Sequence, residues 1–459
     1  MAFSRGAAAA PALHRNRKKE RTSMASMEKI TVTETSLEYI LDFCVNISRD
    51  MIVSGANIER VTISVAKIFA AYELTDTSIY VLSHFISLAA RDHEGGYASR
   101  QVSIRSTGIE LQRLKQLNRL CYAVVEDRPD PETLKDLLKM SNEVSDYPDV
   151  VVMLCRVGAM ICLSLLFGGS WREVLCVIPV TVMMYYLTRL LQRPGLDNTV
   201  INALSMLIAT TAVLLLIKTG ISSNMPTILI TISMMMVPGI PLVNAVRNLL
   251  CGNELNGILQ LGKIVIETLA LAVGIIVAFW FFRVDADSSD VVVTSLSSPI
   301  PVMILSFLTS IFLGVVFGIK YFDLIFAGLG GLLTRIVLIT LSPLIGTRII
   351  LYAASAFVAA LYSEILATKR KDPSTYFIYP AILPLVPGNL FYYTIAGIYA
   401  ADAVMFRTYG VDCLFSAIGM SIGFVLSSIV AHYVRRVRLI KYLRSLIPVH
   451  TAQKKRKKR

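Results

Sequence analysis

Charged residues are scarce in this chain of 459 residues. Asp, Glu, Lys and Arg make up 17% of it, against 54% for hydrophobic residues. Soluble proteins usually contain about 25% charged residues, so this composition excludes a soluble globular protein of such length. From about residue 149 onward the apolar residues form stretches of about 18 to 25 residues, long enough to cross a bilayer as a helix. The sequence therefore predicts an all-α polytopic membrane protein.

About ten transmembrane helices are expected, joined by short connections. They cover residues 149–168, 171–191, 199–218, 224–249, 258–281, 300–319, 321–341, 348–367, 376–399 and 412–434. We assign residues 147–283 to a first membrane half and 300–434 to a second, with an external loop at 284–299 between them.

The segment before the first span is more polar and has a different pattern. Residues 34–146 combine helical spacing of apolar residues with three strand-like runs, at 76–83, 85–91 and 100–106. This pattern predicts a small α+β domain. Residues 1–33 are expected to form a disordered basic leader.

This domain lacks the patterns of an enzyme or a metal protein. It has no G-x-S-x-G sequence, and His93 has no second histidine at the spacing of a helical zinc motif. Ser83 and His84 are adjacent, and neighbours on a strand point to opposite faces. The seven cysteines of the chain show no CxxC spacing. We expect no catalytic residue, no cofactor and no metal site, and a membrane-anchored hydrolase acting through this domain is the alternative.

Acidic residues are absent from the end of the chain. Residues 435–459 carry eleven Lys and Arg, which supply most of the net charge of +13. A basic run directly after a span is typical of a cytoplasmic tail that touches anionic lipid head groups, so no nucleic-acid partner is expected. We predict that both termini are cytoplasmic and that the protein lies in the cytoplasmic (inner) membrane. Whether it forms a homo-oligomer is left open.

Two of the predicted spans are interrupted by the same tripeptide. Val-Pro-Gly occurs at 237–239 and again at 386–388, an offset of 149 (386 − 237). At this offset Gly169 falls on Gly318 and Gly274 on Gly423, and the first five spans fall on the last five. A unit with an odd number of spans is copied upside down, so the pattern predicts two five-helix inverted repeats.

Transporters built from inverted repeats bind their substrates where matching helices are broken. A helix that begins inside the membrane offers unpaired N–H groups and a partial positive charge to an anion. The predicted substrate-binding residues are Pro238, Gly239, Asn244, Pro387, Gly388, Asn389, Tyr392 and Tyr393. The alternative is that both breaks are kinks required for packing.

The fifth span contains two ionisable residues four positions apart, Lys263 and Glu267. This spacing places them on one helix face, where they can pair. Because burial disfavours a charged carboxylate, Glu267 is the candidate for carrying a coupling proton. A purely structural ion pair is the alternative.

Three motifs together resemble those of the threonine/serine exporter family. They are "GANIERV" at 55–61, Gly168-Gly169-Ser170 at the end of the first span, and Val-Pro-Gly in the fourth and ninth spans. The resemblance covers about residues 34–434. It implies export of threonine or serine, driven by the proton motive force, and no enzymatic activity. Split relatives in two chains are linked to export of dicarboxylates such as succinate, so the substrate stays open.

Overall fold

The computed structural model describes residues 34–104, 108–142, 147–192, 197–222, 224–236, 238–284, 298–370 and 372–446; for residues 34, 35, 142 and 435–446 it describes the backbone only. The expected leader at 1–33, nearly all of the expected loop at 284–299 and the end of the basic tail lie outside these residues.

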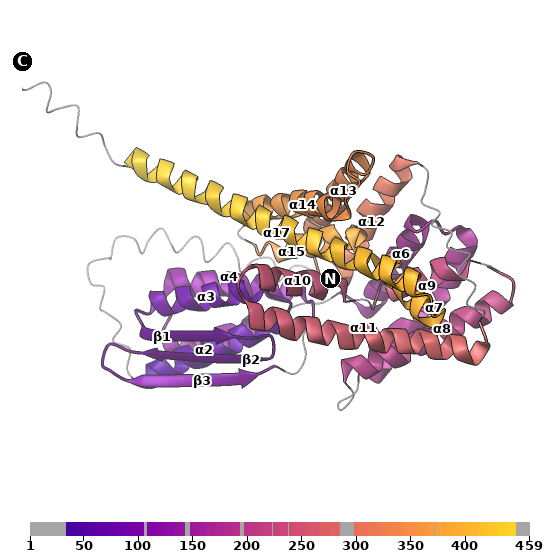
Figure 1. The fold of residues 1–459 in the computed structure, drawn as a ribbon. Helices are drawn as coiled ribbons and strands as arrows, with labels where there is room; N and C mark the ends of the chain where they lie inside the picture. The colour runs from indigo at the N-terminus through magenta and orange to yellow at the C-terminus, as the bar shows by residue number, and fades with distance from the viewer. Residues whose placement is uncertain are drawn as a thin grey trace, which may run out of the picture.

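The N-terminal part is the expected α+β unit. Its elements are α2 (Glu34–Val53), α3 (Ile58–Ala71), β1 (Thr75–Val81), β2 (Phe85–Arg91), β3 (Tyr97–Ser103), α4 (Leu111–Asp127), η2 (Pro131–Thr133) and α5 (Leu134–Asn142). The strands form an antiparallel sheet in the order β1-β2-β3, with helices packed on it (Figure 1). The third strand begins earlier than predicted, because Asp92 accepts hydrogen bonds from the N–H groups of Glu94 and Gly96 and so closes a tight turn.

The "GANIERV" motif has a local structural explanation. Gly55 has a φ of +92°, a conformation that favours glycine, and it reverses the chain after α2. Asn57 then caps α3 by accepting a hydrogen bond from the N–H of Glu59 at 3.3 Å.

Within its described residues, the membrane region contains eight helices long and apolar enough to cross a bilayer. They are α6 (Asp149–Leu166), α7 (Trp171–Leu191), α8 (Asn198–Lys218), α11 (Glu254–Phe282), α12 (Pro299–Val316), α13 (Phe322–Leu341), α14 (Arg348–Arg370) and α17 (Ala403–Leu446). A ninth span is bent by 52°, where α15 (Thr375–Ile382) and η4 (Leu383–Leu385) meet α16 (Gly388–Tyr399). The predicted fourth span consists of two short helices, α9 (Met225–Ser233) and α10 (Gly239–Leu250), because the chain leaves the helix before Pro238.

The second set of helices repeats the first in order. The most direct evidence is a pair of glycine contacts between long helices. Gly274 of α11 packs on the backbone at Ala203 of α8, and Gly423 of α17 packs in the same way at Ala353 of α14. One other match needs correction: Gly168, not Gly169, has the positive φ (+83°) that corresponds to Gly318 (+82°), because these two residues directly follow the C-terminal caps of α6 and α12.

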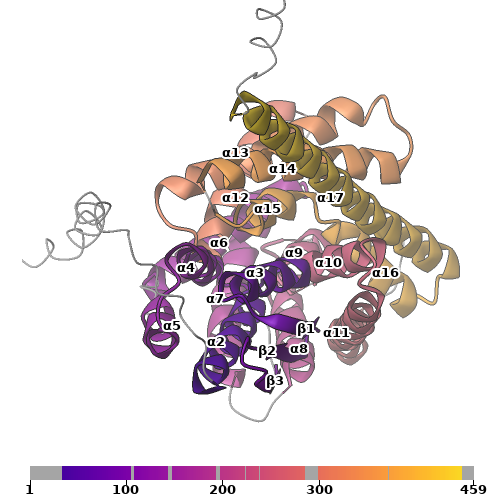
Figure 2. The same ribbon diagram turned by 90° about the vertical axis from the view of Figure 1, so that its left-hand side faces the viewer.

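The N-terminal domain packs on the second half of the membrane region. One hydrophobic core runs from the domain into α13, α14 and α15, while a second core joins most of the first half to α16. Lys115 of α4 is buried between two carboxylates, with its Nζ 2.6 Å from Asp323 and 2.9 Å from Asp372. In Figure 2, seen from the side of the domain, α3 and α4 lie beside α10 and α15.

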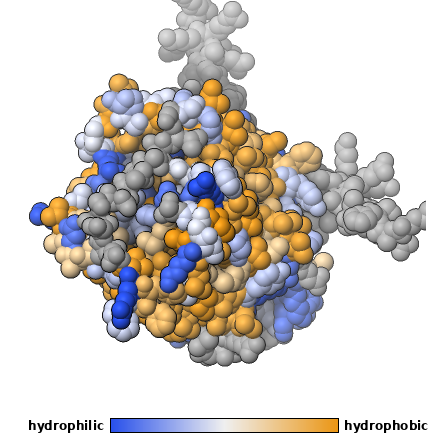
Figure 3. Space-filling view, turned by 90° about the vertical axis from the view of Figure 1, so that its right-hand side faces the viewer, coloured by the Kyte–Doolittle hydropathy of each residue, from blue (hydrophilic) through white to orange (hydrophobic). Residues whose placement is uncertain are grey.

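Polar contacts join the start of α6 to the ends of α7 and α12, on the side of the N-terminal domain. Tyr147, just before α6, donates to the carbonyl of Ile319 after α12, and Arg189 at the end of α7 pairs with Asp149. The opposite end of the molecule, shown in Figure 3, is covered largely by hydrophobic residues, with hydrophilic residues scattered over it. The spans therefore run between a pole at the domain and the pole that faces the viewer in Figure 3.

Candidate functional site

The two helix breaks lie against each other. Space for a side chain at Gly239 is taken by Val386, which precedes the second break, and space at Gly388 is taken by Met234, which precedes the first. A side chain at either position would therefore force its neighbour to shift, which the flexible Met234 allows more easily than Val386 does. The two breaks, which lie 149 positions apart in the sequence, thus form one crossing.

A small apolar cavity remains at this crossing. Its volume is about 30 Å³, and Pro238, Gly239 and Pro387 line it together with Phe391 and Ile264. Helices α10 and α16 both begin here, and no side chain in the described part of the structure caps either N-terminus. A volume of about 30 Å³ corresponds to roughly one water molecule. The breaks meet as the repeat predicted, but in this conformation they leave no room for a metabolite.

A much larger cavity, of about 390 Å³, lies between this crossing and the N-terminal domain. Ile264 lines both cavities, so the large one ends beside the breaks. Its polar lining comes from the C-terminal cap of α7 (Gln192), α8 (Asn198, Asn202), α10 (Asn244), α11 (Gln260, Lys263, Glu267), α15 (Tyr379) and the domain (Ser83, His84). The cavity therefore collects three of the predicted site residues, Asn244, Lys263 and Glu267.

Asn244 belongs to a hydrogen-bond relay that joins both broken spans to the domain. Its Nδ2 donates to the hydroxyl of Tyr379 at 3.1 Å, and that hydroxyl donates to the carbonyl of Gly55 at 3.0 Å. Tyr379 lies on α15, before the second break, and is 3% exposed. Sequence reasoning missed Tyr379, because it considered polar residues after each break and not before it.

Lys263 and Glu267 pair as expected, with their charged atoms 3.9 Å apart. The carboxylate side chain is 14% exposed and the lysine side chain 36%. His84 of the domain lines the same cavity, and partial burial and the positive charge of Lys263 both lower the pKa of its imidazole. The cavity thus presents one positive and one negative formal charge beside a neutral imidazole.

Ser83 serves to hold the domain on α11. Its N–H donates to Oδ1 of Asn256 at 2.9 Å, and its hydroxyl accepts a hydrogen bond from Nε2 of Gln260 at 3.0 Å. Asn256 also donates to the carbonyl of Val81 at 3.1 Å. These bonds fix the β1–β2 turn at the cavity wall and give Ser83 a structural role.

The polar residues after the second break lie elsewhere. Tyr392 and Tyr393 are 3% and 4% exposed and belong to the hydrophobic core of the first half, where Tyr393 stacks on Tyr409 at 5.0 Å. Asn389 is half-buried and, like both tyrosines, lines neither cavity. The structure therefore separates these three residues from Asn244, Lys263 and Glu267. Among the described residues, no group of three or more His, Cys, Asp or Glu is placed to hold a metal ion.

A repeated helical membrane region with two crossed breaks, reached through a cavity from one side, is the architecture of a membrane transport protein. Two family models match the chain: "Putative threonine/serine exporter" over residues 42–282 and "Threonine/Serine exporter, ThrE" over residues 302–430. The chain belongs to the threonine/serine exporter family. This is a family of transporters and agrees with the prediction that the protein is not an enzyme.

Individual relatives support the same class. The chain is 23% identical over 368 residues to the "Probable threonine/serine exporter" of Mycobacterium tuberculosis, covering 76% of this chain and 68% of the relative. It is 30% identical over 140 residues to the "Probable succinate transporter subunit YjjP" of Escherichia coli, and 25% identical over 154 residues to the protein of that name from Klebsiella aerogenes. These two matches cover 30% and 32% of this chain, and 55% and 60% of the relatives. No solved structure matches the chain.

Proposed function

We propose that this protein is a secondary transporter that exports small polar metabolites, in the first place threonine and serine, across the cytoplasmic membrane. The observation that carries the proposal is the cavity of about 390 Å³ that leads from the N-terminal domain to the crossed breaks. A substrate entering from the domain side reaches Lys263 and Glu267 first. Movement of the breaks would then bring it to the N-termini of α10 and α16, whose partial positive charge suits a carboxylate.

The charges of the cavity favour an amino acid over a dicarboxylate. An amino acid carries an ammonium and a carboxylate, which match Glu267 and Lys263, respectively. A dicarboxylate such as succinate carries two negative charges, of which Lys263 could balance one while Glu267 would repel the other. The names of the relatives from Escherichia coli and Klebsiella aerogenes keep succinate as the second candidate.

Transport by exchange tests this proposal directly. Purified protein in vesicles loaded with unlabelled threonine should accumulate labelled threonine by counterflow, which a carrier performs and a channel or a hydrolase does not. Unlabelled serine should compete and succinate should compete poorly. Counterflow of succinate without counterflow of threonine or serine would contradict the assignment of the substrate, and absence of counterflow for all three would contradict the proposed transport.

For the orientation, we propose that the N-terminal domain and both termini face the cytoplasm of the cell and that protons drive export through Glu267. A cysteine at the exposed position Thr219, at the pole away from the domain, should react with an impermeant thiol reagent on intact cells, and a cysteine at the exposed position Lys369 should not. Cys251 is exposed and must be replaced first, whereas burial raises the pKa of Cys121 to about 12 and protects its thiol. The reverse labelling pattern would place the domain outside.

A further inference from the structure

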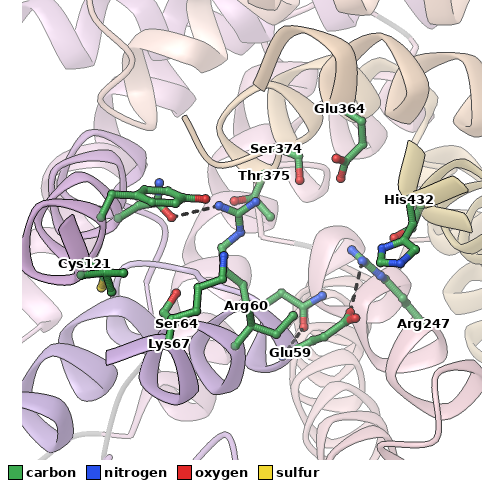
Figure 4. A pocket seen from close by; sticks show the side chains of 16 residues that line it. Glu59, Arg60, Ser64, Lys67, Cys121, Arg247, Glu364, Ser374, Thr375 and His432 are labelled. Atoms are coloured by element: carbon green, nitrogen blue, oxygen red, sulfur yellow. Dashed lines mark hydrogen bonds and ion pairs between the residues drawn. The ribbon is translucent and has the colours of Figure 1, made fainter. Parts of the chain in front are cut away.

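A second cavity between the N-terminal domain and the membrane helices is separate from the transport path. Its volume is about 220 Å³, and it is lined by α3 and α4 of the domain and by α10, α14, α15 and α17. Among the described residues, none lines both this cavity and the one that leads to the breaks. We call it the interface cavity (Figure 4).

Three polar groups of the interface cavity have no hydrogen-bond partner among the described residues. They are Nδ2 of Asn118 on α4, Nε of Arg247 on α10 and the hydroxyl of Thr375 on α15. Asn118 is 2% exposed and Thr375 is 5% exposed. A buried polar group without a partner costs free energy, and three such groups around one cavity indicate that an occupant supplies the partners.

These groups define the chemistry of the occupant. Arg60 donates to Oδ1 of Asn118 at 3.0 Å, and a guanidinium can only donate, so the amide must turn its NH₂ group away from Arg60. The Nε of Arg247 is likewise a donor only. The occupant must therefore supply acceptor atoms, as a carboxylate does.

The charges and the size of the interface cavity further restrict the kind of ligand that fits it. Arg60, Lys67 and Arg247 line it with Glu59 and Glu364, a formal balance of +1 (three positive, two negative). Figure 4 shows Arg60 reaching from α3 toward Ser374 and Thr375. Drug-sized ligands occupy about 300–1,000 Å³, so a cavity of about 220 Å³ suits a smaller molecule, the size of an amino acid or a short dicarboxylate.

The position of the three donors shows what binding would do. Asn118 belongs to the domain, Arg247 lies on the helix that begins at the first break, and Thr375 starts the helix that leads to the second break. A ligand bonded to all three would connect the domain to both broken spans. Because transport requires these spans to move, the ligand would stabilise one arrangement of them over the other.

We propose that the interface cavity is a regulatory site for a small carboxylate metabolite, distinct from the transport site, through which that metabolite controls movement of the broken spans. The binding part of the proposal stands on the three donors alone, and the regulatory part rests on the proposed transport function.

Calorimetric titration of the purified full-length protein tests the binding, with threonine, serine, succinate and inorganic phosphate as separate probes. We expect at least one of the carboxylates to bind to a site that Thr375→Val weakens about tenfold or more, the loss of one charge-assisted hydrogen bond. Thr375→Ser keeps the hydroxyl and should bind as the wild type does. Binding of phosphate alone, or carboxylate binding unchanged by Thr375→Val, would overturn the proposal.

Thermal unfolding separates a ligand site from a structural one. Valine has nearly the shape of threonine, and Thr375→Val removes a buried hydroxyl that has no partner, so the unfolding midpoint without ligand should stay equal or rise. The rise in midpoint that the carboxylate produces in the wild type should be lost. Thr334→Val is the matched control. The Thr334 hydroxyl is buried, does not line the interface cavity and donates to the carbonyl of Gly330 at a distance of 2.8 Å. The unfolding midpoint of this variant should fall, and the rise in midpoint caused by the ligand should remain.

Counterflow in the same variants separates this proposal from the proposed function. If Thr375→Val still exchanges threonine but no longer responds to the bound carboxylate, both proposals stand. If no protein exchanges threonine, serine or succinate while the tenfold loss of binding is seen, the transport proposal fails and the binding site stands. If exchange proceeds and Thr375→Val changes neither the binding of the carboxylate nor its effect on exchange, only the proposed regulatory site is overturned.

Discussion

The two membrane halves share an order of helices but differ in how they meet the N-terminal domain. The second half is joined to the domain through a continuous hydrophobic core and through Lys115, buried between Asp323 and Asp372. The first half meets the domain through amide hydrogen bonds at Asn256 and Gln260, with a large cavity beside them, and through α10, which adds Ile240 and Val243 to the same core and pairs Arg247 with Glu59. The buried ion pair of the domain thus lies with the second half, whereas the cavity that leads to the breaks is lined mainly by helices of the first half.

The two breaks also differ from each other, in their local structure and in the side chains that face their glycines. After α9 the chain continues as hydrogen-bonded turns at Met234–Met236, whereas α15 continues into the short helix η4 before a bend of 52°. Gly239 faces Val386, which is stiff because it is branched at Cβ, and Gly388 faces Met234, which is flexible. Gly239 and Gly388 thus match in the repeat but should differ in how well they tolerate a larger residue.

The largest effect is expected where the domain meets the second half. Lys115→Met leaves Asp323 and Asp372 buried with fewer positive partners, and breaking a buried ion pair costs about 3–5 kcal/mol. We expect a clearly lower midpoint of thermal unfolding for the purified protein. Lys263→Met, at the looser pair of the first half, is the control and should change stability by about 1 kcal/mol or less. Equal effects of the two changes would remove the difference between the halves.

A smaller effect is expected at the crossing of the breaks. Gly239→Ala places a methyl group against Val386 and should cost about 1–3 kcal/mol of stability, as overpacking does, together with loss of counterflow. Gly388→Ala meets Met234, which can move, and should be milder on both measures. Gly262→Ala is the control, because its methyl group would enter open space on α11. A milder effect of Gly239→Ala than of Gly388→Ala would contradict the expectation that Val386 yields less easily than Met234.

Glu267 tests whether the cavity of the first half carries the coupling proton. Glu267→Gln should reduce export driven by a proton gradient to near background while leaving threonine counterflow intact, because exchange requires no net movement of protons. Both activities would be measured in the same vesicles. If they fall together, Glu267 acts only as the partner of Lys263.

The smallest effect concerns His84 at the wall of the same cavity. Burial and Lys263 lower its pKa in the folded protein below the unfolded value of about 6.5. The neutral imidazole therefore favours folding above about pH 6.5, and this contribution is lost as the pH falls through the lower, folded pKa. We expect His84→Gln to lose less stability than the wild type between pH 7 and pH 5, measured by thermal unfolding. An identical pH profile for both proteins would show that the pKa of His84 is not lowered in the folded protein.

Much of this protein follows from the sequence because the deciding features are local. Spans are recognisable because hydrocarbon accepts only a backbone that satisfies its own hydrogen bonds, which requires long apolar helices. The Val-Pro-Gly breaks, their offset of 149 and the pairing of Lys263 with Glu267 need only neighbouring residues or a comparison of two segments.

Only the tertiary structure shows how the N-terminal domain, the broken spans and the predicted site residues contact one another. Tyr379 bridges Asn244 and Gly55, which lie 135 and 324 residues away from it, and no periodicity or propensity encodes such distances. The domain buries Lys115 between Asp323 and Asp372 of the second half, two carboxylates that are distant from it in the sequence. Tyr392 and Tyr393 carry polar groups that suggested a site, yet the packing of α16 placed them in the core. A side chain's chemistry is local, but which surface it faces depends on how the helices pack.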